Sequence, residues 1–261
     1  MDHSKTYWIT GASSGIGAAL ALRLAAAGHR LVISGRNTEA LEKVKRSCGD
    51  KAGISILAFD LENIEAFPAY THQAWEFFGG IDVLVNNAGF SQRALAMETP
   101  EQLERRIMEV NYFAPVALSK AILPYFVKQG SGHIAVVSSI AGKFGFPLRS
   151  SYAAAKHALH GYFEALRLEL QHVPVYVTMI CPGRVKTNIS INALSASGKR
   201  HGVMDEGQRK GISAERCAAV IESAIRRKKY EVLAGGPELI PVYLKRFLPG
   251  LFHLLIRKIK P

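Results

Sequence analysis

The chain alternates short apolar segments with longer amphipathic ones. The short segments are rich in Val, Ile or aromatic residues and end at Gly, Asn, Pro or Ser, a pattern that is typical of β-strands. The predicted strands are Thr6–Thr10, Arg30–Ser34, Ile54–Ala58, Asp82–Asn86, His133–Ser138, Val175–Ile180 and Glu231–Ala234. The longer segments carry apolar residues at helical spacing. The predicted helices are Gly15–Ala27, Glu39–Cys48, Ile64–Phe78, Pro100–Lys128, Ser151–His172 and Ala214–Arg227.

This alternation predicts the class of fold. Strands that are apolar along almost their whole length are buried on both faces, and a helix after each strand indicates parallel pairing with right-handed crossovers. We therefore expect a single α/β domain over residues 1–261. Its core would be a doubly wound parallel sheet of the Rossmann type, with about seven strands and helices on both faces.

One segment interrupts the alternation. Thr187–Gly211 is polar, carries several Gly and Ser residues and contains no predicted strand. A long segment without secondary structure in a compact domain is usually a binding loop, so we expect a substrate lid over residues 187–211. A disordered excursion is the alternative interpretation.

The last segment, residues 237–261, combines apolar and basic positions. Its large apolar residues recur at helical spacing and basic residues accompany them; these are Leu244, Phe247, Leu248, Leu251, Leu255 and Ile259, with Lys245, Arg246, Arg257, Lys258 and Lys260. Such a tail fits an interfacial helix on an anionic membrane. It fits equally well a cover over the pocket or a contact between subunits.

Composition narrows the class of protein further. Hydrophobic residues make up 48% of the chain, which excludes a disordered protein. The net charge of +12 suits an anionic ligand, an anionic membrane or an ordinary basic surface, and no recognition helix or stacking motif supports nucleic-acid binding. Three cysteines without a C-x-x-C pair, and an N-terminus without a signal-peptide pattern, favour a cytoplasmic, reducing environment. We see no zinc-type ligand cluster and predict no metal.

The first predicted strand leads directly into a glycine-rich turn, Thr10-Gly11-Ala12-Ser13-Ser14-Gly15-Ile16-Gly17. Gly11 permits the turn, Gly15 lets phosphates approach the backbone, and Gly17 lets helix and strand pack closely. The helix N-terminus offers N–H groups and partial positive charge to an anion. This arrangement predicts a site for a dinucleotide pyrophosphate.

The end of the second strand bears on which dinucleotide binds. In NAD sites an acidic residue there holds the adenosine ribose, whereas this chain has Arg36. Arg36 could hold a 2′-phosphate by a charge-assisted contact, which favours NADP(H). Pairing of Arg36 with a surface carboxylate is the alternative. Asp60, after the third strand, could contact adenine or could be a solvated strand-end residue.

A second group of residues suggests proton transfer. Tyr152 and Lys156 are four residues apart in a predicted helix and so share one face. We expect the lysine cation to lower the pKa of the tyrosine, which could then donate a proton to a developing alkoxide. Ser139 ends the fifth strand, and its hydroxyl could hydrogen-bond a substrate carbonyl from the other side.

Together these motifs resemble the short-chain dehydrogenase/reductase family. The matching residues span about residues 5 to 235: the glycine-rich turn, Asn86-Asn87-Ala88-Gly89, Asn111, Ser139, Tyr152-Ala153-Ala154-Ala155-Lys156, and Pro182-Gly183 with Thr187. The stretch Ser138–Gly145, with Tyr152–Arg167, is also similar to the branch that contains the dehydrogenase/reductase member 7 proteins. Many family members have serine where this chain has Ala155; the alanine removes no catalytic group.

The resemblance implies specific roles. Tyr152 would be the general acid/base, Lys156 would bind the nicotinamide ribose, Ser139 would orient the carbonyl, and Asn111 would hold a water of a proton relay. The full set of residues implied at the cofactor is Gly11, Ser13, Ser14, Gly15, Ile16, Gly17, Arg36, Asp60, Leu61, Asn87, Ala88, Gly89, Tyr152, Lys156, Pro182, Gly183, Val185 and Thr187. Homo-oligomers, dimers or tetramers built on two long helices, are also implied.

These expectations combine into one function and one alternative. The sequence predicts an NADP(H)-dependent oxidoreductase that moves a hydride between nicotinamide and a carbonyl or secondary alcohol. The substrate would contact Phe90–Ala96, Lys143–Arg149 and the lid. Phe144, Phe146, Pro147 and Leu148 suggest an apolar wall for a lipid- or steroid-like molecule, or else pack against the lid. A non-catalytic NADP(H) sensor on the same fold is the alternative, which the complete set of proton-transfer residues disfavours.

Overall fold

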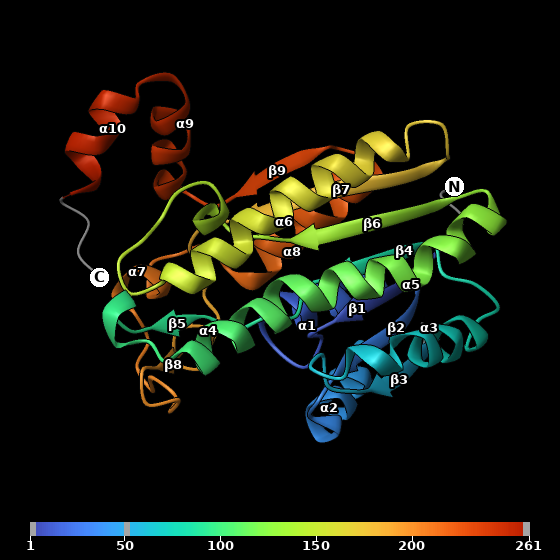
Figure 1. The fold of residues 1–261 in the computed structure, drawn as a ribbon. Helices are drawn as coiled ribbons and strands as arrows, with labels where there is room; N and C mark the ends of the chain where they lie inside the picture. The colour runs from blue at the N-terminus through green and yellow to red at the C-terminus, as the bar shows by residue number, and fades with distance from the viewer. Residues whose placement is uncertain (1–3, 50–52, 258–261) are drawn as a thin grey trace.

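The computed structural model describes residues 4–49 and 53–257, and its main element is one seven-stranded parallel sheet (Figure 1). The strand order is β3-β2-β1-β4-β6-β7-β9, with every neighbouring pair parallel. The strands are β1 (Thr6–Thr10), β2 (Arg30–Gly35), β3 (Ile54–Ala58), β4 (Val83–Asn86), β6 (Gly132–Val137), β7 (Val175–Pro182) and β9 (Glu231–Ala234). The predicted fold class is confirmed, with strand ends shifted by one or two residues.

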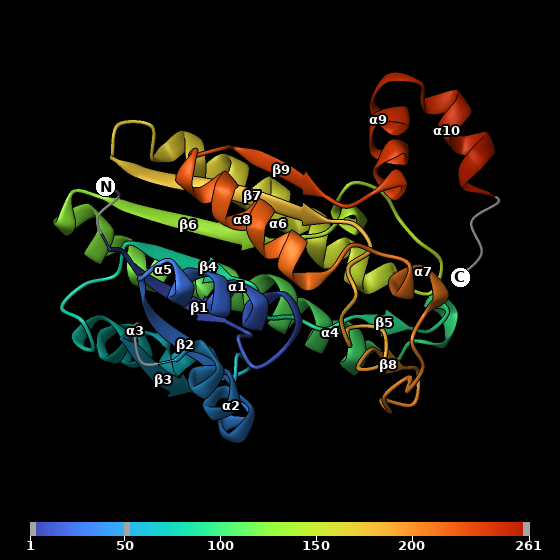
Figure 2. The same ribbon diagram turned by 180° about the vertical axis from the view of Figure 1, so that it is seen from behind.

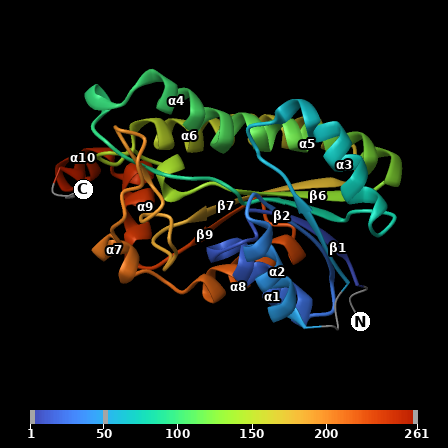
Figure 3. The same ribbon diagram turned by 90° about the horizontal axis from the view of Figure 1, so that it is seen from below.

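Helices cover both faces of the sheet, as Figures 2 and 3 show. One layer contains α1 (Gly15–Ala26), α2 (Thr38–Cys48) and α8 (Ala214–Arg226). The other contains α3 (Phe67–Glu76), α4 (Glu101–Met108), α5 (Ala114–Gln129) and α6 (Ser150–Glu169). Short 3₁₀ turns occur at Ile64–Ala66, Ala96–Glu98, Ile140–Gly142 and Pro237–Leu239, so the predicted helix Ile64–Phe78 is a 3₁₀ turn followed by α3.

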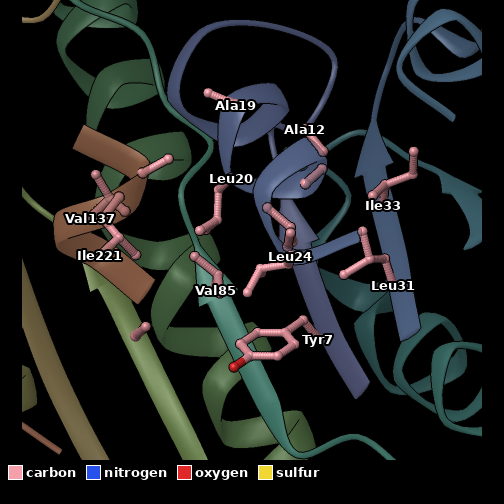
Figure 4. Packing of buried hydrophobic residues seen from close by; sticks show 14 of the residues in the cluster. Tyr7, Ala12, Ala19, Leu20, Leu24, Leu31, Ile33, Val85, Val137 and Ile221 are labelled. Carbon is pink, nitrogen blue, oxygen red and sulfur yellow. The ribbon is translucent and has the colours of Figure 1, made fainter. Parts of the chain in front are cut away.

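Alternate residues along the strands pack into two separate hydrophobic cores, one on each face of the sheet. Tyr7 and Ile9 of β1 pack toward α1, while Trp8 between them is fully buried on the side of α5. Figure 4 shows how Leu20 and Leu24 of α1 lie over β1 and β4 in the first core. Burial on both faces explains why these strands read as continuous apolar runs.

The predicted helix Pro100–Lys128 is interrupted by a wider turn. α4 passes into a π-helical turn, Glu109–Phe113, which continues directly into α5. Within the described ranges this run, 101–129, is the one helix long and apolar enough to cross a membrane by length and composition. Leu118, Ile122 and Phe126 are nevertheless buried against the sheet, as in the core helix of an α/β layer.

The segment expected to contain no strand does contain one. β8 (Leu194–Ser195) pairs in parallel with β5 (Gln92–Arg93) to form a second, two-stranded sheet, and a short helix, α7 (Glu206–Arg209), follows. A strand of two residues is too short to produce an alternating pattern, so sequence periodicity missed it. Residues 187–211 are therefore tied by backbone hydrogen bonds to the segment after β4.

The C-terminal tail forms two helices, α9 (Ile240–Phe247) and α10 (Pro249–Ile256). Leu248 has φ of −137° and ψ of 62°, outside the helical region, and Pro249 follows it. The first helix therefore ends there and the second begins. Phe252 of α10 is buried against Phe144. The expected continuous helical stripe is thus broken in the middle, and the predicted tail positions Lys258, Ile259 and Lys260 lie outside the described residues.

Candidate active site

The cleft begins where the strand order reverses, between the carboxyl ends of β1 and β4. Ligands of open α/β sheets bind at such a point. Asn87, just after β4, donates from its side-chain amide to the backbone oxygens of Thr10 (2.9 Å) and Gly11 (3.3 Å). The Thr10 hydroxyl accepts from the backbone N–H groups of Asn87 and Ala88. These contacts fix the two strand ends that border the cleft.

The glycine-rich turn has a conformation and a close packing that residues with side chains would disturb. Gly11 and Gly15 have φ of +66° and +56°, which glycine adopts readily. A Cβ on Gly17 would lie 2.4 Å from the Gly11 carbonyl oxygen, so Gly17 serves close packing of helix on strand, as predicted. Among the described residues no side chain caps the α1 N-terminus, whose N–H groups are therefore available to an anion.

Nearly all residues implied at the cofactor and in catalysis line one cleft of about 580 Å³. The exception is Gly17, which lies beneath the turn. The lining members are Gly11, Ser13, Ser14, Gly15, Ile16, Arg36, Asp60, Leu61, Asn87, Ala88, Gly89, Asn111, Ser139, Tyr152, Lys156, Pro182, Gly183, Val185 and Thr187. The fold thus brings together residues that are up to 176 positions apart, from Gly11 to Thr187.

Arg36 and Asp60 meet at the nucleotide end of this cleft. Arg36 Nη1 lies 3.8 Å from Asp60 Oδ2, and both side chains are largely exposed. An exposed pair at this distance contributes little to stability, so Arg36 is held loosely. The guanidinium therefore stays accessible at the end of β2, the position where NAD sites have an acidic residue.

Helix α6 presents Tyr152 and Lys156 to the other end of the cleft. Both are almost fully buried, at 6% and 4% exposure. The Lys156 ammonium donates to the backbone oxygen of Val137 (2.9 Å) and lies 5.7 Å from the centre of the Tyr152 ring. Burial lowers the pKa of Lys156 to about 8. The predicted shared face of the helix is confirmed.

The expected effect of Lys156 on Tyr152 is not what the structure shows. Burial raises the pKa of Tyr152 above its usual value, and the groups that oppose this rise are Arg149, a hydrogen bond with Ser139, and Arg93. In this state Lys156 points to Val137 O rather than to the tyrosine oxygen. Tyr152 is therefore held protonated, which suits a proton donor.

Ser138 and Ser139, which follow the end of β6 at Val137, make contacts on different sides of the chain. The Ser139 hydroxyl accepts from the Ala141 backbone N–H (3.1 Å) and faces the cleft beside Tyr152. The Ser138 hydroxyl instead donates to the backbone oxygen of Lys156 (3.1 Å) and contacts His160 Nε2 (3.2 Å). Ser139 is thus the serine that can reach a substrate.

Asn111 sits in the π-helical turn with an incompletely satisfied amide. Its Nδ2 donates to the backbone oxygens of Phe90 and Ile107, both at 3.1 Å. Its Oδ1 is buried and has no hydrogen-bonding partner within the described chain. A Cβ on Gly89 would approach that oxygen to 2.5 Å and the Lys156 ammonium to 3.7 Å. A buried carbonyl oxygen of this kind fits a bound water between Asn111 and Lys156.

The substrate end differs from the expectation of an apolar wall. Phe144 is 2% exposed and packs on Phe146 and on Phe252 of the tail rather than on the cleft. From the segment Lys143–Arg149 only Arg149 lines the cleft. Phe144 and Phe146 thus pack against the C-terminal tail, a contact that the sequence did not suggest.

The structure also reveals an ionic cluster that sequence reasoning missed. Arg93 of β5 and Arg149 both contact Asp205, the residue that precedes α7, and both line the cleft. The three residues are far apart along the chain, and none belongs to a motif. The pairing of β5 with β8 and a backbone hydrogen bond from Ala94 to Leu148 bring the three segments together, and neither contact is visible in the sequence.

Behind the site, His160, Cys181 and Glu231 have potential ligand atoms within 4.8 Å of one another. The sequence did not suggest this group. The Lys143 ammonium lies among them, 2.5 Å from Glu231 Oε2 and 3.3 Å from His160 Nδ1. A cation is therefore already present, and burial lowers the pKa of His160 to about 3, which keeps the ring neutral. We interpret the group as a partly exposed Lys143–Glu231 ion pair next to a buried neutral histidine.

Comparisons with known proteins agree with this site. The sequence model of the family described as "short chain dehydrogenase" matches residues 5–197. The Bos taurus protein named "Dehydrogenase/reductase SDR family member 7B" is 41% identical over 256 residues, 95% of this chain and 79% of that protein. The chain therefore belongs to the short-chain dehydrogenase/reductase family, and its resemblance to the member 7 branch is confirmed.

Two solved structures extend the comparison. A short-chain dehydrogenase/reductase from Burkholderia phymatum in complex with NAD is 25% identical, with a TM-score of 0.84, covering 99% of this chain and 97% of that one. A short-chain dehydrogenase from Sphingobium yanoikuyae in complex with NADPH is 25% identical, with a TM-score of 0.78, covering 98% and 96%. Its neighbours thus bind either nicotinamide cofactor, and this chain is an oxidoreductase of their family.

Proposed function

We propose that this protein is an NADP(H)-dependent reductase that converts a ketone or aldehyde to an alcohol. The observation that carries the proposal is the convergence of Ser139, Tyr152, Lys156 and Asn111 at one end of a cleft whose other end is a phosphate cradle. When bound, the nicotinamide supplies the hydride to the carbonyl carbon, or accepts it in the reverse direction.

The residues of the chain would handle the oxygen and its proton. Ser139 and Tyr152 would hydrogen-bond the carbonyl oxygen, and the Tyr152 hydroxyl would give its proton to the alkoxide as the hydride arrives. The Lys156 ammonium, with a water held by Asn111 Oδ1, would return a proton to the tyrosinate. Raised pKa and deep burial of Tyr152 support this role, since they keep the proton on the tyrosine until charge develops.

Arg36 supports the choice of NADP(H). Its side chain is 65% exposed at the end of β2 and only loosely paired with Asp60. A guanidinium there would bind a 2′-phosphate bidentately. Substitution Arg36→Ala should raise the KM for NADPH by about tenfold to a hundredfold and leave the KM for NADH nearly unchanged. Wild-type protein that uses NADH better than NADPH would overturn this part of the proposal.

The test of the function is NADPH oxidation by the purified protein over small and bulky carbonyls, such as 2,3-butanedione, 4-nitrobenzaldehyde and 2-decanone. We expect turnover that falls by at least about a hundredfold in Tyr152→Phe, because that variant cannot give a proton. The competing function is a non-catalytic NADP(H) sensor. Tight NADPH binding, unaffected by Tyr152→Phe and without turnover of any carbonyl, would favour the sensor.

We also propose contact between copies of the chain through the layer of α5 and α6. Phe113, Val127 and Leu168 are large apolar side chains that are 47%, 51% and 68% exposed on this layer. Exposed apolar residues of this kind are typical of subunit interfaces. Light scattering by the purified protein should give a mass above that of one chain, and a Phe113→Glu variant should shift it toward the monomer. A monomeric wild type would refute the proposal.

A further inference from the structure

Two arginines share a single carboxylate beside Tyr152. Asp205 Oδ2 pairs with Arg93 and lies 3.0 Å from Arg149 Nη2. The side chains of Arg93, Arg149 and Asp205 are only 7%, 26% and 26% exposed. The cluster therefore holds one more positive than negative charge in a half-buried wall of the cleft.

The two arginines differ in how many donors they have left. Arg93 uses Nε and Nη2 on Asp205, and Nη1 on the Gln92 carbonyl oxygen (2.8 Å). Arg149 uses Nη2 alone among the hydrogen bonds of the described residues, and its guanidinium lies 5.7 Å from the Phe146 ring. The remaining N–H groups of Arg149 are available to a ligand in the cleft.

The electrostatics of Arg149 favour an anionic ligand. Burial, followed by repulsion from Arg93, lowers the pKa of Arg149 to about 10, so the cation is not fully compensated. Both arginines act on the ionisation of Tyr152, which places them close to the reacting end of the cleft. Burying a cation without a full partner is costly unless a ligand supplies the opposite charge.

We propose that the substrate carries an anionic group, a carboxylate or a phosphate, which Arg149 binds with Arg93 beside the carbonyl that Tyr152 serves. This inference rests on the proposed reductase function and names its substrate class. The cofactor does not need these arginines for its own phosphates, because Arg36 and the glycine-rich turn lie at the opposite, β1–β2 side of the cleft. Phe90, Ile189 and Leu194 also line the cleft, so an apolar remainder fits beside the anion.

The test compares ketones that differ only in charge. The pairs are 4-oxodecanoate with its methyl ester, and 4-hydroxybutan-2-one phosphate with the free hydroxyketone. In the wild type we expect kcat/KM to favour the charged member of at least one pair by about tenfold or more. The pair with the larger ratio distinguishes a carboxylate from a phosphate. In Arg149→Gln that ratio should fall toward one, while Arg105→Gln, at an exposed arginine of α4, should leave it unchanged.

A binding measurement separates this inference from the reductase function. With NADP⁺ present, octanoate or octyl phosphate should raise the melting temperature of the wild type more than octanamide does, and Arg149→Gln should abolish the difference. Asp205→Asn removes the competing carboxylate and should keep or increase the preference for anions. Equal responses to charged and uncharged ligands in both assays would overturn the inference, even if the uncharged ketones are reduced.

A second proposal stands on the C-terminal helices. α9 and α10 project from the carboxyl end of the sheet (Figure 1), and α9 is anchored by the Lys245 ammonium on the Lys143 carbonyl oxygen (2.7 Å). The two helices and their junction carry large apolar side chains that are 44% to 73% exposed: Ile240, Tyr243, Phe247, Leu248, Leu251, Leu254 and Leu255. Exposed apolar residues gathered in this way mark an interaction surface.

Charge identifies the partner. From residue 239 to the end of the chain there are five Lys and Arg residues and no Asp or Glu. A second copy that docked the same surface would bring like charges together, whereas anionic lipid would complement them. We infer that α9 and α10 bind the surface of an anionic membrane, with Phe247 and Leu254 inserted among the lipids.

Co-sedimentation with vesicles tests this proposal. The full chain should bind vesicles of phosphatidylcholine with 30% phosphatidylglycerol at low salt, and much less at 0.5 M NaCl or without phosphatidylglycerol. The double variant Phe247→Ser/Leu254→Ser should lose binding, and Leu22→Ser, at an exposed position of α1, should retain it. Equal sedimentation of wild type and double variant would refute the proposal. So would a double variant whose only change is a smaller mass in light scattering, which would assign the surface to a second copy.

Discussion

Lys156 illustrates how one residue sets a pH range for the reaction. Its ammonium is 4% exposed, and burial lowers its pKa to about 8. A lysine whose folded-state pKa is lowered keeps its charge below that pKa and loses it as the pH rises through it. Tyr152 stays protonated over this range because burial raises its pKa.

We therefore expect kcat/KM for NADPH, which reports on the free enzyme, to be constant near pH 7 and to fall above about pH 8. The pH profile should be measured with an uncharged ketone as the substrate. Lys156→Arg retains its charge at all these pH values, so its fall should move to higher pH even if its rate is lower. A wild-type profile that stays flat to pH 9.5 would contradict the assignment of Lys156.

At this scale, the residues that the sequence revealed are those tied to motifs. Tyr152 and Lys156 could be paired because helical spacing fixes their relative position. Ser139 could be chosen over Ser138 because it lies thirteen residues before Tyr152, and strand alternation lets only one of the two serines face the substrate. Arg93, Arg149 and Asp205 could not be found, since nothing local joins them. The pKa shift of Tyr152 was also mispredicted, because the contact of Lys156 with Val137 O depends on the tertiary structure.

At the scale of elements, the turn between β1 and α1 depends on the absence of a side chain at Gly17. A methyl group at Gly17 would lie 2.4 Å from the Gly11 carbonyl oxygen and 2.6 Å from the side-chain nitrogen of Asn87, which is itself held by hydrogen bonds to Thr10 and Gly11. Gly161 in α6 has open space around the same position. The two glycines are thus a matched pair for one substitution.

Gly17→Ala should lower the free energy of unfolding by about 1–3 kcal/mol and weaken NADPH binding, because the turn must shift. Gly161→Ala should instead stabilise the helix by about 0.5–1 kcal/mol and leave binding unchanged. Urea denaturation and NADPH titration of both variants measure these effects. Similar stabilities for the two variants would show that the turn adapts more easily than its geometry suggests.

Elements with strong periodicity were predictable, and short or interrupted ones were not. The strands of the main sheet and α1 matched because each buries a long apolar face. β5, β8 and α7 are two to four residues long and carry no period. The tail was read as one helical stripe, yet Leu248 and Pro249 divide it, because proline cannot continue α9.

For the whole molecule, burial on both faces of the sheet also encloses two histidines. His133 and His160 are 6% and 8% exposed, and burial lowers their pKa values to about 4 and about 3. An unfolded chain binds protons on histidine near pH 6.5, whereas these folded sites resist protonation. These two histidines therefore leave the free energy of unfolding unchanged above about pH 6.5, and they lower it as the pH falls toward 4.

The melting temperature should thus drop by several degrees between pH 7 and pH 5, with His133 contributing about 2 kcal/mol at pH 5. His133→Gln keeps a donor near the position of the histidine Nε2, which lies 2.7 Å from the Thr178 hydroxyl, and should reduce the drop. His72→Gln, at an exposed position of α3, should not. Equal drops in melting temperature for the two variants would show that His133 is not a cause of the loss of stability.

The wide turn at Glu109–Phe113 has a consequence for how this fold tolerates changes of chain length. Each residue of an α-helix advances the following side chains by about 100°, so a single insertion in α4 would carry Asn111 away from the cleft. A π turn already accommodates one surplus residue. Deleting Asn111 itself would restore a regular helix, leave α5 in place on the sheet, and remove the relay amide. Chains of this fold could therefore lose that step of proton supply by a three-nucleotide deletion, or gain it by the matching insertion, without rebuilding the domain.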